Sequence, residues 1–328
     1  MKSENMKIVV TGGCGFIGRK SIERLLVQIP ETKIRVLDNE TTCSRNDLRK
    51  VCDVNIINDT TSSWDHPVSM MVADVRDAAA VLACTDGADA IIHLAANTGV
   101  SPSIKDPVTD CLINVLGTLN VLEACRLHAV GQMIFASSGA PLGVQVPPLH
   151  EELAAHPASP YGASKLAGEG YCSAYFHAFG VKSTVLRFGN VYGPGSGHKS
   201  SVVAKFIQQA LAGQDWEIYG DGAQTRDFIY IDDLISAIMA SLMSPHSGGE
   251  TFQIATSNET TIVEMTKMLR MVLQDAGIGV PNIHFSAPRV GDVNRNFSDT
   301  SKAKNLLNWE AKVNLCDGLK RTVQDFKI

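Results

Sequence analysis

A glycine-rich turn near the N-terminus places the strongest constraint on how this chain of 328 residues folds. Residues 11–18 read Thr-Gly-Gly-Cys-Gly-Phe-Ile-Gly. They follow a run of β-branched residues, Ile8–Thr11, and lead into a segment with helical periodicity, Ile17–Gln28. The arrangement predicts a strand, a tight turn and a helix that begins within the turn.

The spacing of the glycines favours a dinucleotide site over an ordinary glycine-rich turn. Gly12 suits the tight turn, Gly15 lets a diphosphate approach the backbone, and Gly18 lets the helix pack on the strand. The helix N-terminus offers unpaired N–H groups and a positive dipole to phosphates. Asp38 ends the second predicted strand, twenty residues after Gly18, where a carboxylate binds the adenosine ribose. Since it would repel a 2′-phosphate, we expect NAD rather than NADP.

A second carboxylate, Asp74, follows the third predicted strand in Ala73-Asp74-Val75. It could reach the adenine amino group or cap the next helix, and the two roles are compatible.

Strand-like runs alternate with helical segments through the first 190 residues, which predicts an α/β Rossmann-type doubly wound parallel sheet. We expect an NAD-binding domain at 1–184, to which about 227–256 returns. Residues 185–328 would mostly form a smaller C-terminal substrate-binding lobe, with a cleft between the two. The predicted strands are Ile8–Thr11, Ile34–Leu37, Met70–Ala73, Ala90–Leu94, Met133–Ala136 and Thr184–Leu186, and the main helices are Ile17–Gln28, Leu112–His128, Ala163–His177 and about Val203–Leu211.

Composition narrows the class of protein. With 29 Lys and Arg against 34 Asp and Glu, the net charge of −5 disfavours nucleic acid as a partner. The eight cysteines form no C-x-x-C pair and no cluster at zinc spacing, so we expect reduced thiols, a cytoplasmic location and no metal site. The N-terminus lacks a signal-peptide core, and the apolar stretch Leu234–Met243 is about half a membrane span.

Tyr161 and Lys165 stand four residues apart at the start of a predicted helix and share one face. Lowering a tyrosine pKa from ~10 to ~7 needs about 4 kcal/mol. One cation ~4 Å away at an effective dielectric of ~20 supplies about that. Lys165, helped by a nicotinamide cation, would make Tyr161 a base, whereas an ordinary amphipathic helix is the alternative. Ser138 follows the predicted strand Met133–Ala136, where it could hold a substrate oxygen or simply form a turn.

Together these motifs resemble the extended short-chain dehydrogenases/reductases, specifically the NAD-dependent sugar-nucleotide epimerase/dehydratase family, from Lys7 to about Phe326. Further matching pieces are Ile92–Ala96, Asn114–Thr118, Leu186–Pro194, Gly220–Phe228 and Arg289–Asp292. The resemblance implies that Ser138, Tyr161 and Lys165 are catalytic. The implied NAD contacts are Gly12, Gly15, Phe16, Ile17, Gly18, Asp38, Asn39, Asp74, Val75, Leu94, Ala95, Ala96, Asn114, Tyr161 and Lys165. The implied substrate contacts are Ser138, Asn190, Tyr219, Arg226 and Arg289.

Several of these roles have structural alternatives. Arg226 and Arg289 suit a nucleotide diphosphate, but each could instead form a salt bridge with Asp227 or Asp292. Asn114 is expected to brace the helix and the cofactor region rather than to do chemistry. His198 and Lys199 could read a substrate carboxylate, although we expect them to lie in a solvated loop.

In the family that this chain resembles, the residues directly after the catalytic serine differ with the reaction that each member catalyses. Members that dehydrate the sugar have an Asp-Glu pair there, decarboxylases have a Glu, and the 3,5-epimerase/reductases have a Cys. This chain has Gly139-Ala140. By subtraction we expect a UDP-sugar 4-epimerase that forms a transient 4-keto sugar and recycles its NAD. The alternatives are a sugar-nucleotide dehydrogenase or reductase and a non-catalytic NAD-binding protein. The family's four-helix interface, matched by Leu112–His128 and Ala163–His177, implies a homodimer.

Overall fold

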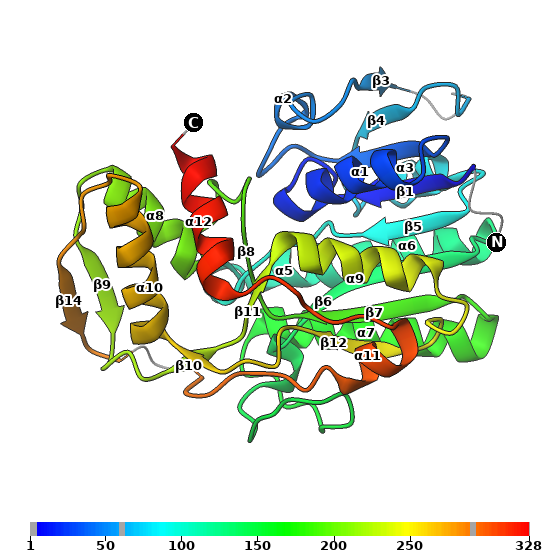
Figure 1. Cartoon of the computed structure of the whole chain (residues 1–328). Coiled ribbons are helices and arrows are strands. Elements are labelled where there is room, and N and C mark those ends of the chain that lie inside the picture. The colour runs from blue at the N-terminus through cyan, green and yellow to red at the C-terminus, as the bar shows by residue number, and fades with distance from the viewer. Residues whose placement is uncertain (1–4, 59–62, 289–292, 328) are drawn as a thin grey trace.

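An eight-stranded sheet forms the centre of the computed structural model, which describes residues 5–58, 63–288 and 293–327 (Figure 1). Each neighbouring pair of its strands is parallel. From edge to edge the strands are β12 (Thr251–Ile254), β7 (Ser183–Phe188), β6 (Gln132–Ser138), β5 (Ala90–His93), β1 (Lys7–Thr11), β2 (Lys33–Asp38), β4 (Val68–Val72) and β3 (Asn55–Ile57). The predicted doubly wound α/β sheet is therefore confirmed, and strand order reverses between β1 and β5, where such sheets bind ligands at their carboxyl ends.

Helices cover both faces of this sheet (Figure 1). One face carries α1 (Phe16–Gln28), α9 (Ile231–Met243) and α11 (Ser301–Leu307), and the other carries α3 (Ala78–Thr85), α6 (Gly117–Leu127) and α7 (Pro160–Phe179). Successive side chains of β1 point to opposite faces of the sheet, so Ile8 and Val10 pack against the first layer of helices and Val9 packs against the second. Each fully buried side chain of this kind contributes roughly 1.5–3 kcal/mol.

A smaller lobe lies beside the carboxyl ends of the strands (Figure 1). It consists of α8 (Val202–Leu211), β9 (Trp216–Tyr219), α10 (Ile262–Asp275), β14 (Ile283–Ser286) and α12 (Leu315–Phe326). Trp216 stacks on Phe206 with ring centroids 4.8 Å apart, and both belong to the same continuous apolar core as the α1 layer. The lobe therefore shares its core with the sheet domain.

The remaining elements are short. They are α2 (Arg45–Leu48), α4 (Val100–Lys105), α5 (Pro107–Cys111), the π-helical turn η1 (Leu112–Leu116), the 3₁₀ turn η2 (Ala140–Leu142), β8 (Asn190–Tyr192), β10 (Thr225–Arg226), β11 (Phe228–Tyr230) and β13 (Thr260–Thr261). α2 and β3 lie in a polar stretch for which the sequence predicted no element. β12 joins the main sheet, so part of the segment 227–256 lies there.

One helical stretch among the described residues, Pro107–Leu127, joins α5, η1 and α6 and is long and apolar enough by length and composition to cross a membrane. Of its 18-residue apolar window, 44% is buried in the protein. Its inner residues, including Val121 and Leu122, pack under the sheet. It is therefore a core helix.

Candidate functional site

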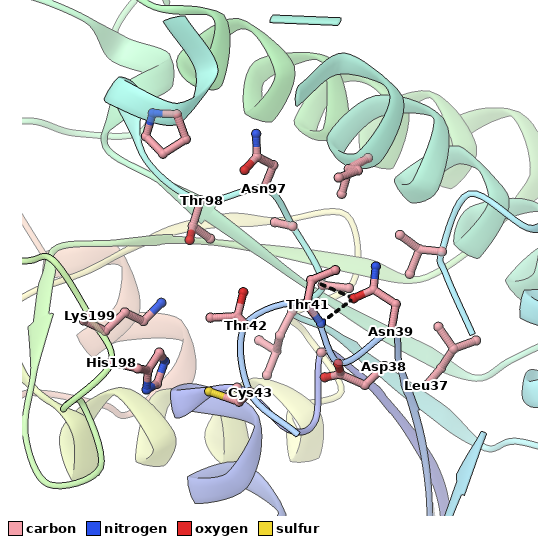
Figure 2. A pocket seen from close by; sticks show the side chains of 18 of the residues that line it. Leu37, Asp38, Asn39, Thr41, Thr42, Cys43, Asn97, Thr98, His198 and Lys199 are labelled. Atoms are coloured by element: carbon pink, nitrogen blue, oxygen red, sulfur yellow. Dashed lines mark hydrogen bonds between the residues drawn. The ribbon is translucent and has the colours of Figure 1, made fainter. Parts of the chain in front are cut away.

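A cavity of about 380 Å³ opens at the carboxyl ends of β1, β2 and β5 (Figure 2). It lies at the reversal of strand order, as expected for a nucleotide site. Its described walls include many of the predicted cofactor residues: Gly12, Gly15, Asp38, Asn39, Val75, Leu94, Ala95 and Ala96. Phe16, Ile17 and Gly18 begin α1 just behind this wall.

The glycine turn has the backbone geometry that the sequence predicts for it. Gly12 has a φ of +70°, and a Cβ added there would lie 2.8 Å from the backbone nitrogen of Ala95. A Cβ at Gly18 would lie 2.3 Å from the carbonyl oxygen of Gly12. Any larger residue at this position would therefore prevent α1 from packing as closely against the turn as it does here. No side chain caps α1, which begins after Gly15 without an acidic residue in its first turn. Its N–H groups therefore suit a diphosphate.

The Asp38 carboxylate is held at one end of the cavity by two backbone donors. Oδ2 accepts from the Cys14 N–H at 3.0 Å and Oδ1 from the Glu40 N–H at 2.8 Å. Burial raises the pKa of Asp38, while these two hydrogen bonds oppose the rise. Each carboxylate oxygen keeps accepting capacity for a ribose hydroxyl. The residues present thus fit NAD.

Asp74 does not cap the following helix, which corrects one of its two expected roles. The cap of α3 is Asp77, which accepts from the N–H groups of Ala79 and Ala80. Asp74 instead binds the Arg76 guanidinium at 2.9 Å and the Asn39 amide at 2.8 Å. Asp74 therefore contacts Asn39, which lines the cavity.

The three predicted catalytic residues come from two neighbouring elements. α7 begins at Pro160 after Ser159, whose side chain accepts from the Gly162 N–H, and this places Tyr161 in the first turn. Ser138 ends β6, and its side chain hydrogen-bonds Tyr161. Lys165 is 3% exposed, and its Nζ donates to the carbonyl oxygen of Ala136 at 2.8 Å.

The pKa of Tyr161 moves opposite to what a base needs. Burial raises it to about 12, despite the hydrogen bond from Ser138. Burial also lowers the pKa of Lys165 to about 8, although Asp110 and Glu169 favour its charged form. In the protein without its cofactor, burial therefore keeps the Tyr161 hydroxyl protonated.

A buried polar cluster that the sequence analysis missed lies under this pair. Asp110 is fully buried on α5; its Oδ1 accepts from the Asn114 amide at 3.1 Å, and its Oδ2 has no partner among the described residues. The same Asn114 amide donates to Ser164 Oγ at 3.0 Å and to the carbonyl oxygen of Asn97, a cavity residue, at 3.0 Å. The spacing of Asp110 and Asn114 by one helical turn could have revealed the cluster.

Replacing Asp110 by Asn is expected to shift the pH profile of kcat/KM to lower pH. Asp110 raises the pKa of both Lys165 and Tyr161, so removing its charge lowers both. The other groups facing Lys165 keep their charge: Glu169 remains, and His93 stays neutral because burial lowers its pKa to about 3.

Asp106→Asn is the matched control for this measurement. Asp106 is the exposed cap of α5, where Asn caps as well as Asp. A profile that is the same for Asp110→Asn and Asp106→Asn would contradict the role of Asp110.

A second cavity, of about 200 Å³, lies in the smaller lobe. Asn190 of β8, Tyr219 of β9 and Arg226 of β10 all line it, so three predicted substrate residues from distant parts of the sequence come together. The Arg226 guanidinium donates to the carbonyl oxygens of Thr225 and Val293, at 2.6 and 2.7 Å. Arg289 and Asp292 lie outside the described residues.

The sequence analysis left open that Arg226 forms a salt bridge with Asp227 instead of binding a diphosphate. The Asp227 carboxylate accepts from the backbone and hydroxyl of Thr256, at 2.8 and 2.6 Å, and from the Ser298 N–H at 3.3 Å. Its hydrogen bonds therefore anchor the loops that follow β12 and precede α11.

Comparison with known proteins places this arrangement in a family. The model of the NAD dependent epimerase/dehydratase family matches residues 8–255. A UDP-glucose 4-epimerase of Mycolicibacterium smegmatis is 33% identical, over 98% of this chain and 99% of its own length.

Two solved structures have the same fold throughout. The UDP-glucose 4-epimerase of Thermotoga maritima with UDP-glucose has a TM-score of 0.86 at 32% identity, covering 98% of this chain and 99% of its own. The UDP-glucuronic acid 4-epimerase of Bacillus cereus, in complex with UDP-glucuronic acid and NAD, has a TM-score of 0.86 at 28% identity over 98% and 99%. With its cofactor turn, its Tyr and Lys, and matches over nearly its whole length, this chain belongs to the NAD dependent epimerase/dehydratase family, the extended short-chain dehydrogenases/reductases that act on sugar nucleotides.

Proposed function

We propose that the protein epimerises a UDP-sugar at C4 through a transient 4-keto sugar. The observation that carries the proposal is the turn that follows Ser138. Beside the catalytic serine of this chain stand Gly139 and Ala140, neither of which can donate or accept a proton through a side chain. A Cβ built at Gly139 would have the Asn296 amide nitrogen at 3.9 Å as its one neighbour within 4 Å among the described residues, so no clash at that atom requires a glycine there.

The protein groups act on the C4 hydroxyl of the sugar. Tyr161 removes its proton while Ser138 holds the oxygen by a hydrogen bond, and Lys165 stabilises the phenolate. Bound NAD supplies the reversible acceptance of hydride that this oxidation requires. Tyr161 then returns the proton after the keto sugar has presented its other face. Without a second acid and base, dehydration at C5 and C6 has no side chain to carry it.

Arg226 and Asn190 are proposed to bind the nucleotide diphosphate, and Tyr219 is proposed to lie near the base. Replacing Arg226 by Met is expected to weaken the binding of UDP roughly 10- to 100-fold, since a charge-assisted hydrogen bond to an anion contributes about 1.5–3 kcal/mol. Isothermal titration calorimetry with UDP measures this. Arg226→Lys should recover part of the affinity, and equal affinity in Arg226→Met and the unchanged protein would remove Arg226 from the site.

A dehydrogenase or reductase that releases its keto product is the second candidate within the family. Absorbance at 340 nm during turnover of UDP-glucose and UDP-glucuronic acid distinguishes the two. The epimerase forms no NADH beyond the single equivalent bound per chain, whereas NADH that grows in proportion to substrate would establish the dehydrogenase. Absence of any turnover with UDP-sugars would favour the non-catalytic alternative.

We also propose a cytoplasmic homodimer. α4, α5, η1 and α6 pack against α7, and these elements expose several apolar side chains: Val100, Ile104, Val108, Leu112, Leu116, Tyr171 and Phe179. Exposed apolar side chains gathered in this way are typical of a protein interface.

Replacing both Leu112 and Leu116 by Glu is expected to halve the mass in solution, because buried charges would oppose association. Size-exclusion chromatography with light scattering measures the mass. Val27→Glu changes an exposed apolar side chain on α1, on the other face of the sheet, and should leave the dimer intact. A dimer that survives in the double variant would exclude this interface.

A further inference from the structure

Lys199 lines the cofactor cavity, although its neighbours in the loop, Gly197, His198 and Ser200, are exposed to solvent as the sequence predicted. It belongs to the loop at 193–201, between β8 and α8, which comes from the smaller lobe. Figure 2 shows its side chain reaching toward Thr42 and Thr98, across the cavity from Asp38 and Asn39.

The loop that carries Lys199 is tied to helices on both sides. The Arg19 guanidinium of α1 donates to the carbonyl oxygen of Gly195 at 3.1 Å, and the Gly195 N–H donates to the Asp325 carboxylate of α12 at 2.7 Å. The Lys199 N–H donates to the carbonyl oxygen of Ser196 at 2.8 Å. These bonds hold Lys199 at the cavity.

Within the described chain, Lys199 forms no ion pair with a carboxylate. Asp47 is bound to Arg19 at 3.6 Å and to Lys50 at 3.1 Å, and Glu40 is bound to Arg45 at 2.5 Å. Burial lowers the pKa of Lys199, because water solvates the charged ammonium poorly at this position. Lys199 is partly buried, and a partly buried cation that faces a cavity is poorly solvated without an anion, so an anionic ligand is indicated.

Lys199 is the only lysine or arginine among the described residues that line this cavity. Its neighbour His198 stays neutral at pH 7, because burial and Lys199 lower its pKa to about 4. Asp38 is the only carboxylate in the same lining. A ligand that fits both side chains would place its hydroxyl groups near the Asp38 carboxylate and its negatively charged groups near the Lys199 ammonium.

We propose that Lys199 binds the diphosphate of the cofactor, opposite the N-terminus of α1, and so links the smaller lobe to the bound NAD. The alternative source of a diphosphate is the sugar nucleotide. Lys199 lines the cavity that contains Gly12, Gly15 and Asp38, whereas the second cavity is lined by Ser200 and Arg226 and not by Lys199. The cofactor's diphosphate therefore suits this lysine better.

This link would help keep NAD bound while the sugar reacts, as the proposed epimerase requires. The inference rests on NAD binding, which family membership supports, and not on the C4 chemistry. Binding of NAD can therefore be tested separately from epimerisation.

The test measures the binding of NAD, ADP-ribose and UDP to nucleotide-stripped protein by isothermal titration calorimetry. Lys199→Met is expected to weaken NAD and ADP-ribose alike, roughly 10- to 100-fold, and to leave UDP unchanged. Lys199→Arg should restore most of the affinity. Lys320→Met removes an exposed lysine on α12 and should change none of the three.

Thermal unfolding shows whether a loss of affinity reflects misfolding. Because Lys199→Met removes a partly buried cation that has no carboxylate partner among the described residues, the ligand-free variant should melt no lower than the unchanged protein, while NAD should raise its melting temperature less. Equal NAD affinity in Lys199→Met and the unchanged protein would overturn the proposal. So would a loss confined to UDP, which would assign Lys199 to the substrate.

Discussion

Replacing Tyr161 by Phe is expected to lower kcat by about 10²- to 10⁴-fold while NAD and UDP bind as before. The substitution removes the one hydroxyl that is placed to take the proton from the sugar, and it keeps the ring. Ser138 still hydrogen-bonds the sugar oxygen, but it has no base to receive the proton. Initial rates with a coupled assay for the epimer, together with calorimetry for NAD and UDP, separate the chemical step from binding.

Tyr175→Phe is the matched control because it removes a second hydroxyl from the same helix. The Tyr175 hydroxyl donates to Glu123 at 2.5 Å on the far part of α7 and lines neither cavity. Its kcat should stay within about twofold of the unchanged protein. A Tyr161→Phe variant that turns over at the same rate as Tyr175→Phe would rule out Tyr161 as the base.

Replacing Arg187 by Met is expected to lower the free energy of unfolding by about 3–5 kcal/mol. Arg187 of β7 and Glu169 of α7 are 7% and 8% exposed, and the guanidinium donates two hydrogen bonds to the carboxylate, at 2.9 and 2.7 Å. Glu169 also accepts from the Ser137 hydroxyl at 2.5 Å, and Ser137 precedes Ser138, which is proposed to be catalytic. Loss of Arg187 would leave Glu169 as an uncompensated charge inside the protein. Urea denaturation followed by circular dichroism measures the loss.

Arg295→Met tests whether burial of the ion pair causes the loss of stability expected for Arg187→Met. Arg295 makes the same two-bond contact with Glu259, at 2.7 and 2.7 Å, but its side chain is 56% exposed. An exposed pair contributes about 0–1 kcal/mol, so this variant should unfold almost as the unchanged protein does. Similar losses in the two variants would contradict the explanation from burial.

The parts of the site that the sequence predicted are those whose geometry is local. The glycine turn is one continuous segment between β1 and α1, so its backbone geometry follows from residue type and spacing. Tyr161 and Lys165 lie one helical turn apart, and the caps Ser159 and Pro160 set the start of α7. In each case neighbours in sequence are neighbours in space.

The parts that the sequence analysis missed depend on contacts between distant segments. Asp110 meets Lys165 only because α5 packs against α7, and Lys199 reaches the cofactor cavity only because the smaller lobe folds back on the sheet. The effects of burial and of Asp110 on the pKa of Tyr161 were also missed, because the sequence argument weighed only the charges of Lys165 and of a nicotinamide cation. Burial is a property of the packed structure.

The central claim is C4 epimerisation without net oxidation. Proton NMR of the protein incubated with a panel of UDP-sugars, without added NAD, tests it most directly. At least one UDP-sugar should convert to a mixture with its C4 epimer, reaching the same ratio from either side, with no accumulation of a keto sugar. A panel in which a 4-keto or 4-keto-6-deoxy product builds up, or in which each sugar returns unchanged while the protein holds NAD, would contradict the account.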